Sequence, residues 1–194
     1  ALVISGTSSL VTFDAAHVRN IANLILELGQ EDSGSPNDTV LVNNGSLDSA
    51  IGLQNLTINT GSGVDEITFM EDEFLLPVAN GGIVINAGIG TDRLIVVSDA
   101  ELLELDAMAG APVGTPAELR LGTIAAPGSL GTLTLTNIAG EDVTVSGGAG
   151  DNTFDLSLWS NGARAEINGS TGDDTMIGLD VNAIWNITGT NSGQ

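Results

Sequence analysis

One short pattern recurs along this chain and limits its fold more than any other feature. The pattern is a glycine-containing turn that ends in Asp or Asn, with strand-like apolar residues on both sides; its clearest copy is VTVSGGAGDNTFDL at 143–156. Weaker copies lie at 31–42, 58–69, 85–96 and 167–178. The aligned acidic or amide residues, separated by 27, 27, 60 and 22 residues, are Asp38, Asp65, Asp92, Asn152 and Asp174. Recurrence at this period indicates a repeat protein of the solenoid type.

The apolar residues beside these turns alternate with polar ones, as in a strand that buries one face. After the turn, one aligned position holds Val40, Ile67, Leu94, Phe154 and Met176. Before the turn, another position holds Leu56, Ile83, Val143 and Ala165. No single unit can bury such a face alone, so successive units must stack. We therefore predict that residues 1–194 form one all-β domain, a parallel β-solenoid (β-helix) of about eight coils.

The stretches between the repeats are less regular. Residues 2–5 and 10–13 fit short strands. Residues 14–28 fit either a helix or, as the other units favour, a strand over 21–28. One short helix is expected near 99–109, because the spacing of the leucines and the residues at both ends suit a helix. The gap of 60 residues is expected to hold about two coils without the Asp signature, including strands at 118–124 and 131–138 with a turn at 127–128.

The charge of the chain excludes several kinds of partner. The net charge is −21, with 25 acidic residues against four arginines and no lysine. No basic patch can replace the counterions of phosphates, so nucleic acid is not an expected partner. No run of about 18 apolar residues is present, so membrane insertion is not expected either. Because the chain is so acidic, cations are its natural partners. Cysteine is absent, which excludes disulfide scaffolds and thiolate metal sites.

The sequence GGAGDNTFD at 147–155 closely resembles the nonapeptide of RTX (haemolysin-type) calcium-binding repeats, GGxGxDxUx. The other copies are degenerate, with one or both leading glycines replaced. Those repeats place two nonapeptides in an 18-residue coil, whereas the motif here returns after 22 to 27 residues. The whole chain is more similar to the long repeat regions of very large bacterial surface proteins that carry RTX-like motifs.

The two ends of the chain carry a second resemblance. WNITGTNSGQ at 185–194, joined to ALVISGTSSLVTF at 1–13 and then to NIANL at 20–24, is similar to one continuous phrase of those repeat proteins. The resemblance implies that the chain is one period of a tandem array, or a subunit that joins copies of itself head to tail. An extracellular or cell-surface location fits this resemblance together with the acidity and the lack of cysteine.

Calcium is the candidate cofactor. It takes six to eight oxygen ligands from carboxylates and carbonyls, and glycine-rich turns expose carbonyls. Stacked carboxylates also repel one another, which a bound cation would relieve. The candidate metal ligands are Asp151, Asn152, Asp173, Asp174, Asp65, Asp92 and Asp38. The alternative is that these Asp and Asn side chains only satisfy backbone groups of the turns.

Catalysis is not expected from the residues present. Glycoside hydrolysis needs two placed carboxylates, but among 25 acidic residues some pair always looks suitable. Lyases of the β-helix type also use Lys or Arg as a base, and no lysine exists. His17 is the only histidine, and a lone histidine is more often structural. Trp159 and Trp185 suit either stacking on glycans or, more simply, capping of the core.

The sequence thus predicts a structural repeat unit or subunit of an extracellular bacterial filament, sheath or surface adhesin. Assembly is expected head to tail, by β-pairing between the end coils of copies. The alternative is a calcium- or carbohydrate-binding spacer module of a giant adhesin.

Overall fold

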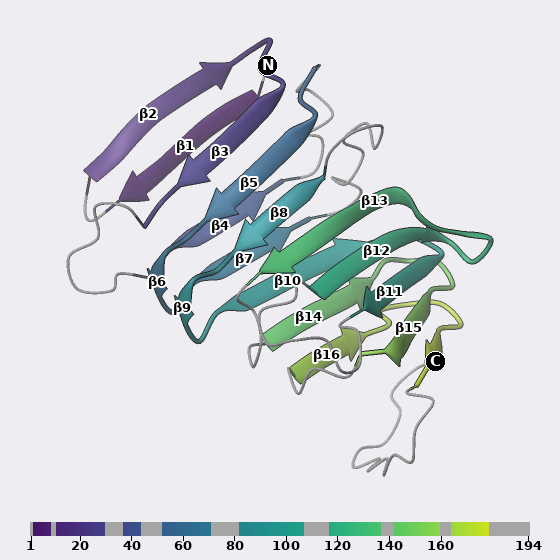
Figure 1. The fold of residues 1–194 in the computed structure, drawn as a ribbon. Coiled ribbons are helices and arrows are strands. Elements are labelled where there is room, and N and C mark those ends of the chain that lie inside the picture. The colour runs from purple at the N-terminus through teal and green to yellow at the C-terminus, as the bar shows by residue number, and fades with distance from the viewer. Residues whose placement is uncertain are drawn as a thin grey trace.

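The structure is a computed structural model of the chain, and every element in it is a β-strand (Figure 1). The residues that it describes are 2–8, 11–29, 37–43, 52–70, 82–106, 117–136, 142–159 and 164–178. Within these ranges there is no helix, and so none with the length and hydropathy that crossing a bilayer requires.

Two main sheets contain most of the strands (Figure 1). The five-stranded sheet is parallel throughout, in the order β16 (Arg164–Asn168), β14 (Asp142–Gly147), β10 (Arg93–Ser98), β7 (Glu66–Phe69) and β4 (Thr39–Val42). The eight-stranded sheet has the order β17 (Thr175–Ile177), β15 (Thr153–Leu158), β11 (Leu102–Asp106), β12 (Ala117–Thr123), β13 (Ala126–Thr136), β8 (Ile83–Asn86), β5 (Asn55–Asn59) and β3 (Asn23–Glu27).

Two smaller sheets complete the described strands. The first is an antiparallel hairpin of β1 (Leu2–Ser8) and β2 (Val11–Val18), and the second is a parallel pair of β6 (Ser62–Gly63) and β9 (Ile89–Gly90). The hairpin confirms the two expected N-terminal strands, and β3 confirms the strand expected over 21–28. The prediction of an all-β fold with mostly parallel strands is confirmed as well.

The chain passes back and forth between the two main sheets, whose inward side chains form one core. Along strands such as β4, β5 and β7, buried residues alternate with more exposed ones, which is the period-two pattern of the sequence. Register pairing sets the inward residues of neighbouring strands side by side. One such row in the five-stranded sheet contains Val42, Phe69, Val96, Val145 and Ile167. Trp159 is also buried in this core, which agrees with a core role for it; Trp185 lies outside the described residues.

The repeated turns connect the two main sheets in two different directions, which corrects the single five-way alignment. We call the connections from the eight-stranded to the five-stranded sheet outgoing corners, and those in the opposite direction returning corners. Asp38, Asp65 and Asp92 end outgoing corners, whereas Asn152 and Asp174 end returning corners. Consequently Leu94, which follows the turn of its own copy, pairs with Val143, which precedes the turn of another copy. Phe154 pairs instead with Met176 and Leu103.

The segment between the third and fourth copies also differs from the prediction. The expected short helix near 99–109 is wrong where the structure describes it, because 102–106 form the strand β11. The expected pair of coils is also wrong: β11, β12 and β13 form an antiparallel meander, with the turn at 124–125 rather than 127–128. Leu103, Leu105 and Leu119 are buried in the core, and this tertiary packing outweighs local helix propensity.

Candidate functional site

The outgoing corners are joined by a ladder of carboxylates. Oδ1 of Asp65 accepts a hydrogen bond from the backbone N–H of Asp38, with a nitrogen–oxygen distance of 2.8 Å. Oδ1 of Asp92 accepts one from the N–H of Asp65 at 2.9 Å. Asp65 and Asp92 are each only 1% exposed. Every step of the ladder therefore ties a buried carboxylate to the backbone of the preceding outgoing corner.

Glycine is required at these corners because the backbones of successive corners lie almost in contact. Gly61 and Gly88 have φ values of 97° and 89°, in the left-handed region that side chains disfavour. A Cβ added to Gly88 would lie 1.8 Å from the carbonyl oxygen of Gly61. Directly before these two glycines, the buried hydroxyl of Thr60 donates a hydrogen bond to the carbonyl oxygen of Ala87 at 2.9 Å.

The returning corners have a ladder of their own. Oδ1 of Asp174 accepts from the N–H of Asn152 at 3.0 Å, and Oδ1 of Asp151 accepts from the N–H of Asp173 at 2.8 Å. Asn152 is 1% exposed, and its Nδ2 donates to the carbonyl oxygen of Ala100 at 2.7 Å. An amide is needed here because a carbonyl oxygen can only accept a hydrogen bond.

Asp99 also belongs to the returning edge, although no sequence motif indicated this role. Its Oδ1 accepts a hydrogen bond from the N–H of Ala149 at 3.0 Å. The two residues are 50 positions apart, and Asp99 stands outside every copy of the repeated turn. Only knowledge that β10 and β14 are neighbours could have paired them.

The structure divides the candidate calcium ligands between the two edges. Asp38, Asp65 and Asp92 lie along the outgoing edge, and the returning edge holds Asp151, Asn152, Asp173 and Asp174. Across the described ranges, no three His, Cys, Asp or Glu side chains gather closely enough to hold a metal ion. Among the described residues, Oδ2 of Asp65 finds no hydrogen-bond partner although it is buried, and it is a candidate donor for a cation. Calcium binding stays a prediction, while the hydrogen bonds fit the alternative role in satisfying turn backbone.

Asp65→Ala is expected to lower the free energy of unfolding by about 1–3 kcal/mol, because the N–H of Asp38 loses its acceptor in a part-buried site. Asn37→Ala is the matched control: it removes the same kind of hydrogen bond, from the N–H of Val64, at an exposed position and should cost less than about 0.5 kcal/mol. Urea denaturation in EGTA and in millimolar calcium measures both. A purely backbone-satisfying Asp65 gives the same loss in both solutions, and a loss that grows in calcium would assign Asp65 to a cation site.

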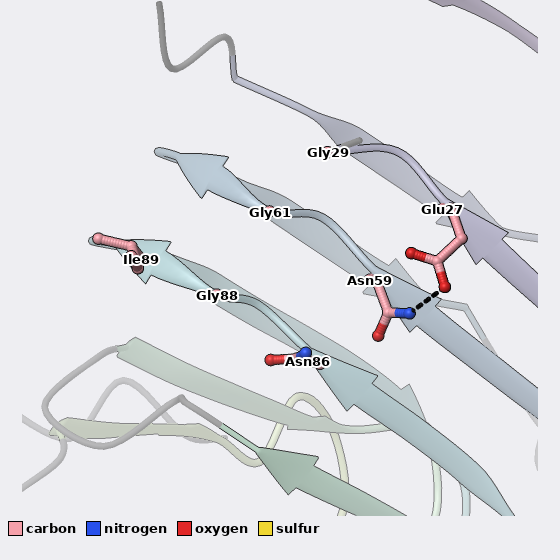
Figure 2. Close-up of a pocket in the computed structure, with 7 residues that line it drawn as sticks. All are labelled: Glu27, Gly29, Asn59, Gly61, Asn86, Gly88 and Ile89. Atoms are coloured by element: carbon pink, nitrogen blue, oxygen red, sulfur yellow. Dashed lines mark hydrogen bonds between the residues drawn. The ribbon is translucent and has the colours of Figure 1, made fainter. Parts of the chain in front are cut away.

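A trough of about 410 Å³ runs along the outgoing edge, across the ends of β3, β5 and β8 (Figure 2). Its lining residues are Glu27, Gly29, Asn59, Gly61, Asn86, Gly88 and Ile89. The polar side chains form a column in which Nδ2 of Asn59 donates to Oε1 of Glu27 at 2.7 Å. Ile89, 79% exposed, extends on the other side of the glycine backbones (Figure 2). The trough thus presents amide and carboxylate groups one strand apart, with no cationic side chain in its lining.

Arg120 holds the antiparallel meander together on the outer face of the eight-stranded sheet. Its guanidinium forms ion pairs with Glu104 on β11 and Asp106 at 2.8 Å, and with Glu118 at 2.7 Å. Burial by itself would lower the pKa of Arg120, but the hydrogen bonds to Glu118 and Glu104 outweigh it and raise this pKa above its usual value. The arginine therefore stays charged and links β11 to β12.

No protein family, curated protein or solved structure matches this chain.

Proposed function

We propose that the chain is a structural β-solenoid unit of an extracellular bacterial filament, sheath or surface adhesin, and that units join head to tail. One observation carries the proposal: within the described residues, both main sheets end in strands that are hydrogen-bonded on one side only. These are β3 and β17 in the eight-stranded sheet, and β4 and β16 in the five-stranded sheet. An unpaired edge strand is a template for pairing with another chain.

The repeated passage between two sheets supports the solenoid part of the proposal. Five passes through the five-stranded sheet stack in register without a shift. Side-chain ladders at both edges link each coil to the next, as a stack of repeats requires. In this proposal the meander β11–β13 is an insertion into the stack.

Strand direction favours head-to-tail growth over a closed dimer. All strands of the five-stranded sheet point the same way, so β4 and β16 are parallel edges of one sheet. A copy placed further along the stack continues parallel pairing, whereas a two-fold dimer would set identical edges antiparallel. A contact between different surfaces that does not close into a ring grows a fibre.

The high negative charge sets the conditions for such growth. Each copy carries a net charge of −21, so adjoining copies repel one another. Salt screens this repulsion over about 10 Å at 0.1 M, and divalent cations oppose it more strongly. Calcium is therefore expected to favour assembly even without a dedicated site.

Met176→Lys is expected to raise the protein concentration needed for assembly about tenfold or more. Met176 pairs with the buried Phe154 but is itself 51% exposed, because β17 ends its sheet. A further coil would bury it, and an unpaired Lys there opposes that burial. Ile89→Lys is the matched control, with the same charge on a 79% exposed side chain away from the end coils. Sedimentation velocity of both variants tests the proposal, and equal assembly by the two, or a wild type that never assembles, would contradict it.

The trough at the outgoing edge favours a second candidate, the calcium- or carbohydrate-binding spacer module of a giant adhesin. Its neighbouring amides donate and accept hydrogen bonds, as the hydroxyls of a neutral glycan require. Titration of the unassembled protein with neutral oligosaccharides separates the two functions. Binding that is lost in Asn59→Ala, without any end-to-end assembly of the wild type, would favour the spacer.

A further inference from the structure

The rows of the five-stranded sheet define a register that is the same from one end to the other. One inward row runs through Val40, Ile67, Leu94, Val143 and Ala165. No register shift interrupts any of its four strand pairs. The eight-stranded sheet has shifts and two antiparallel pairings, so its ends are less simply related. The five-stranded sheet is thus the part of the molecule whose continuation is best defined.

The inward residues of this sheet become more exposed at its ends. Ile67 and Leu94 in the middle are 0% exposed, while Val40 on β4 is 9% exposed. On β16, Ala165 and Ile167 are only partly buried against the core. Each end therefore has an edge strand with small or β-branched residues facing the core, which suits a strand of the same kind beside it.

We infer that β16 of one copy pairs in parallel with β4 of the next, in the register that continues the rows, so that Ala165 and Ile167 lie beside Val40 and Val42. This inference rests on the proposed head-to-tail function and specifies the surface that carries it. The partner is a second copy of this chain. It needs no strand exchange, because each edge offers the backbone N–H and C=O groups that the other lacks.

The same register brings one outward pair together across the junction. Within the chain, an outward row runs through Leu41, Thr68, Ile95, Thr144 and Glu166. Its continuation places Glu166 of one copy directly beside Leu41 of the next. Leu41 is 55% exposed in the single chain and so can be replaced with little effect on its folding. A charge at position 41 then reports on the identity of its neighbour.

The test compares Leu41→Glu with Leu41→Lys by sedimentation velocity of the full chain in the same salt and calcium. Directly opposed like charges destabilise a strand pair and opposite charges stabilise it, by about 0.2–1 kcal/mol each. We expect Leu41→Glu to need about tenfold more protein than Leu41→Lys for half assembly. The double variant Leu41→Glu with Glu166→Lys should restore assembly to the level of Leu41→Lys. Ile89→Glu and Ile89→Lys carry the same charges away from the junction and should differ much less.

The outcomes separate this inference from the function on which it rests. If the wild type assembles but the two Leu41 variants differ no more than the two Ile89 variants, the register is wrong and head-to-tail assembly stands. If the double variant fails to recover while both single variants keep the wild-type melting temperature, Glu166 is not the neighbour of Leu41. A wild type that stays monomeric overturns both.

Discussion

Gly88→Ala is expected to lower the free energy of unfolding by about 2–5 kcal/mol, because the added methyl group meets a neighbouring backbone and the position has a positive φ. The added Cβ would lie 1.8 Å from the carbonyl oxygen of Gly61, so the two coils would have to separate. The φ of 89° adds a backbone penalty of about 1–2 kcal/mol for an L-residue. Overpacking of a tight site contributes about 1–3 kcal/mol more. Urea denaturation of the variant and the wild type measures the difference.

Two other glycines separate these contributions. Gly52 has a φ of 93°, but no atom of the described part of the chain lies within 4 Å of an added Cβ, so Gly52→Ala should cost only the backbone penalty of about 1–2 kcal/mol. An added Cβ at Gly150 also meets open space, and its φ lies outside the left-handed region, so Gly150→Ala should change stability by less than about 0.5 kcal/mol. Equal losses for Gly88→Ala and Gly52→Ala would mean that the coils do not stack as closely as described.

Asn152→Asp is expected to cost about 3–5 kcal/mol at pH 7, because it replaces a buried donor by an uncompensated charge. Nδ2 of Asn152 lies 2.7 Å from the carbonyl oxygen of Ala100, and a carboxylate there would face another acceptor. Burial and this carbonyl raise the pKa of the introduced carboxyl above its unfolded value. The variant therefore recovers stability relative to the wild type as the pH falls through the folded pKa, and loses it as the pH rises.

The measurement is the difference in unfolding free energy between Asn152→Asp and the wild type at pH 7 and near pH 4. Asn168→Asp is the control, since Asn168 is exposed and its Oδ1 accepts from the N–H of Ser170, which a carboxylate also does. It should stay within about 0.5 kcal/mol of the wild type. An equal deficit for Asn152→Asp at both pH values would contradict the donor role of Asn152.

The regular spacing of the sequence was enough to predict that Asp38, Asp65 and Asp92 lie one above the other. Asp65 and Asp92 follow their predecessors by 27 residues, and the structure joins each to the coil before it. The alternation of residues such as Ile67 and Phe69 likewise predicted strands with one buried face. These features depend on neighbours in sequence or on a constant period, which a single sequence contains.

The parts that could not be predicted depend on partners distant in sequence. A strand that alternates apolar and polar residues has the same pattern in either main sheet, so the edge on which Asn152 lies could not be read from its turn. The segment 102–106 has helix-compatible leucines, but it pairs with β12 and β15. The ion pairs of Arg120 with Glu104 and Asp106 then fix that pairing.

Cryo-electron microscopy of the concentrated protein in millimolar calcium tests the central claim, head-to-tail stacking, most directly. The account predicts fibres whose strands run across the long axis, with a repeat of about 4.8 Å along it. Successive copies should join through the β4 and β16 edges. Monodisperse protein at every calcium concentration and pH, or fibres whose strands run along the axis, would contradict it.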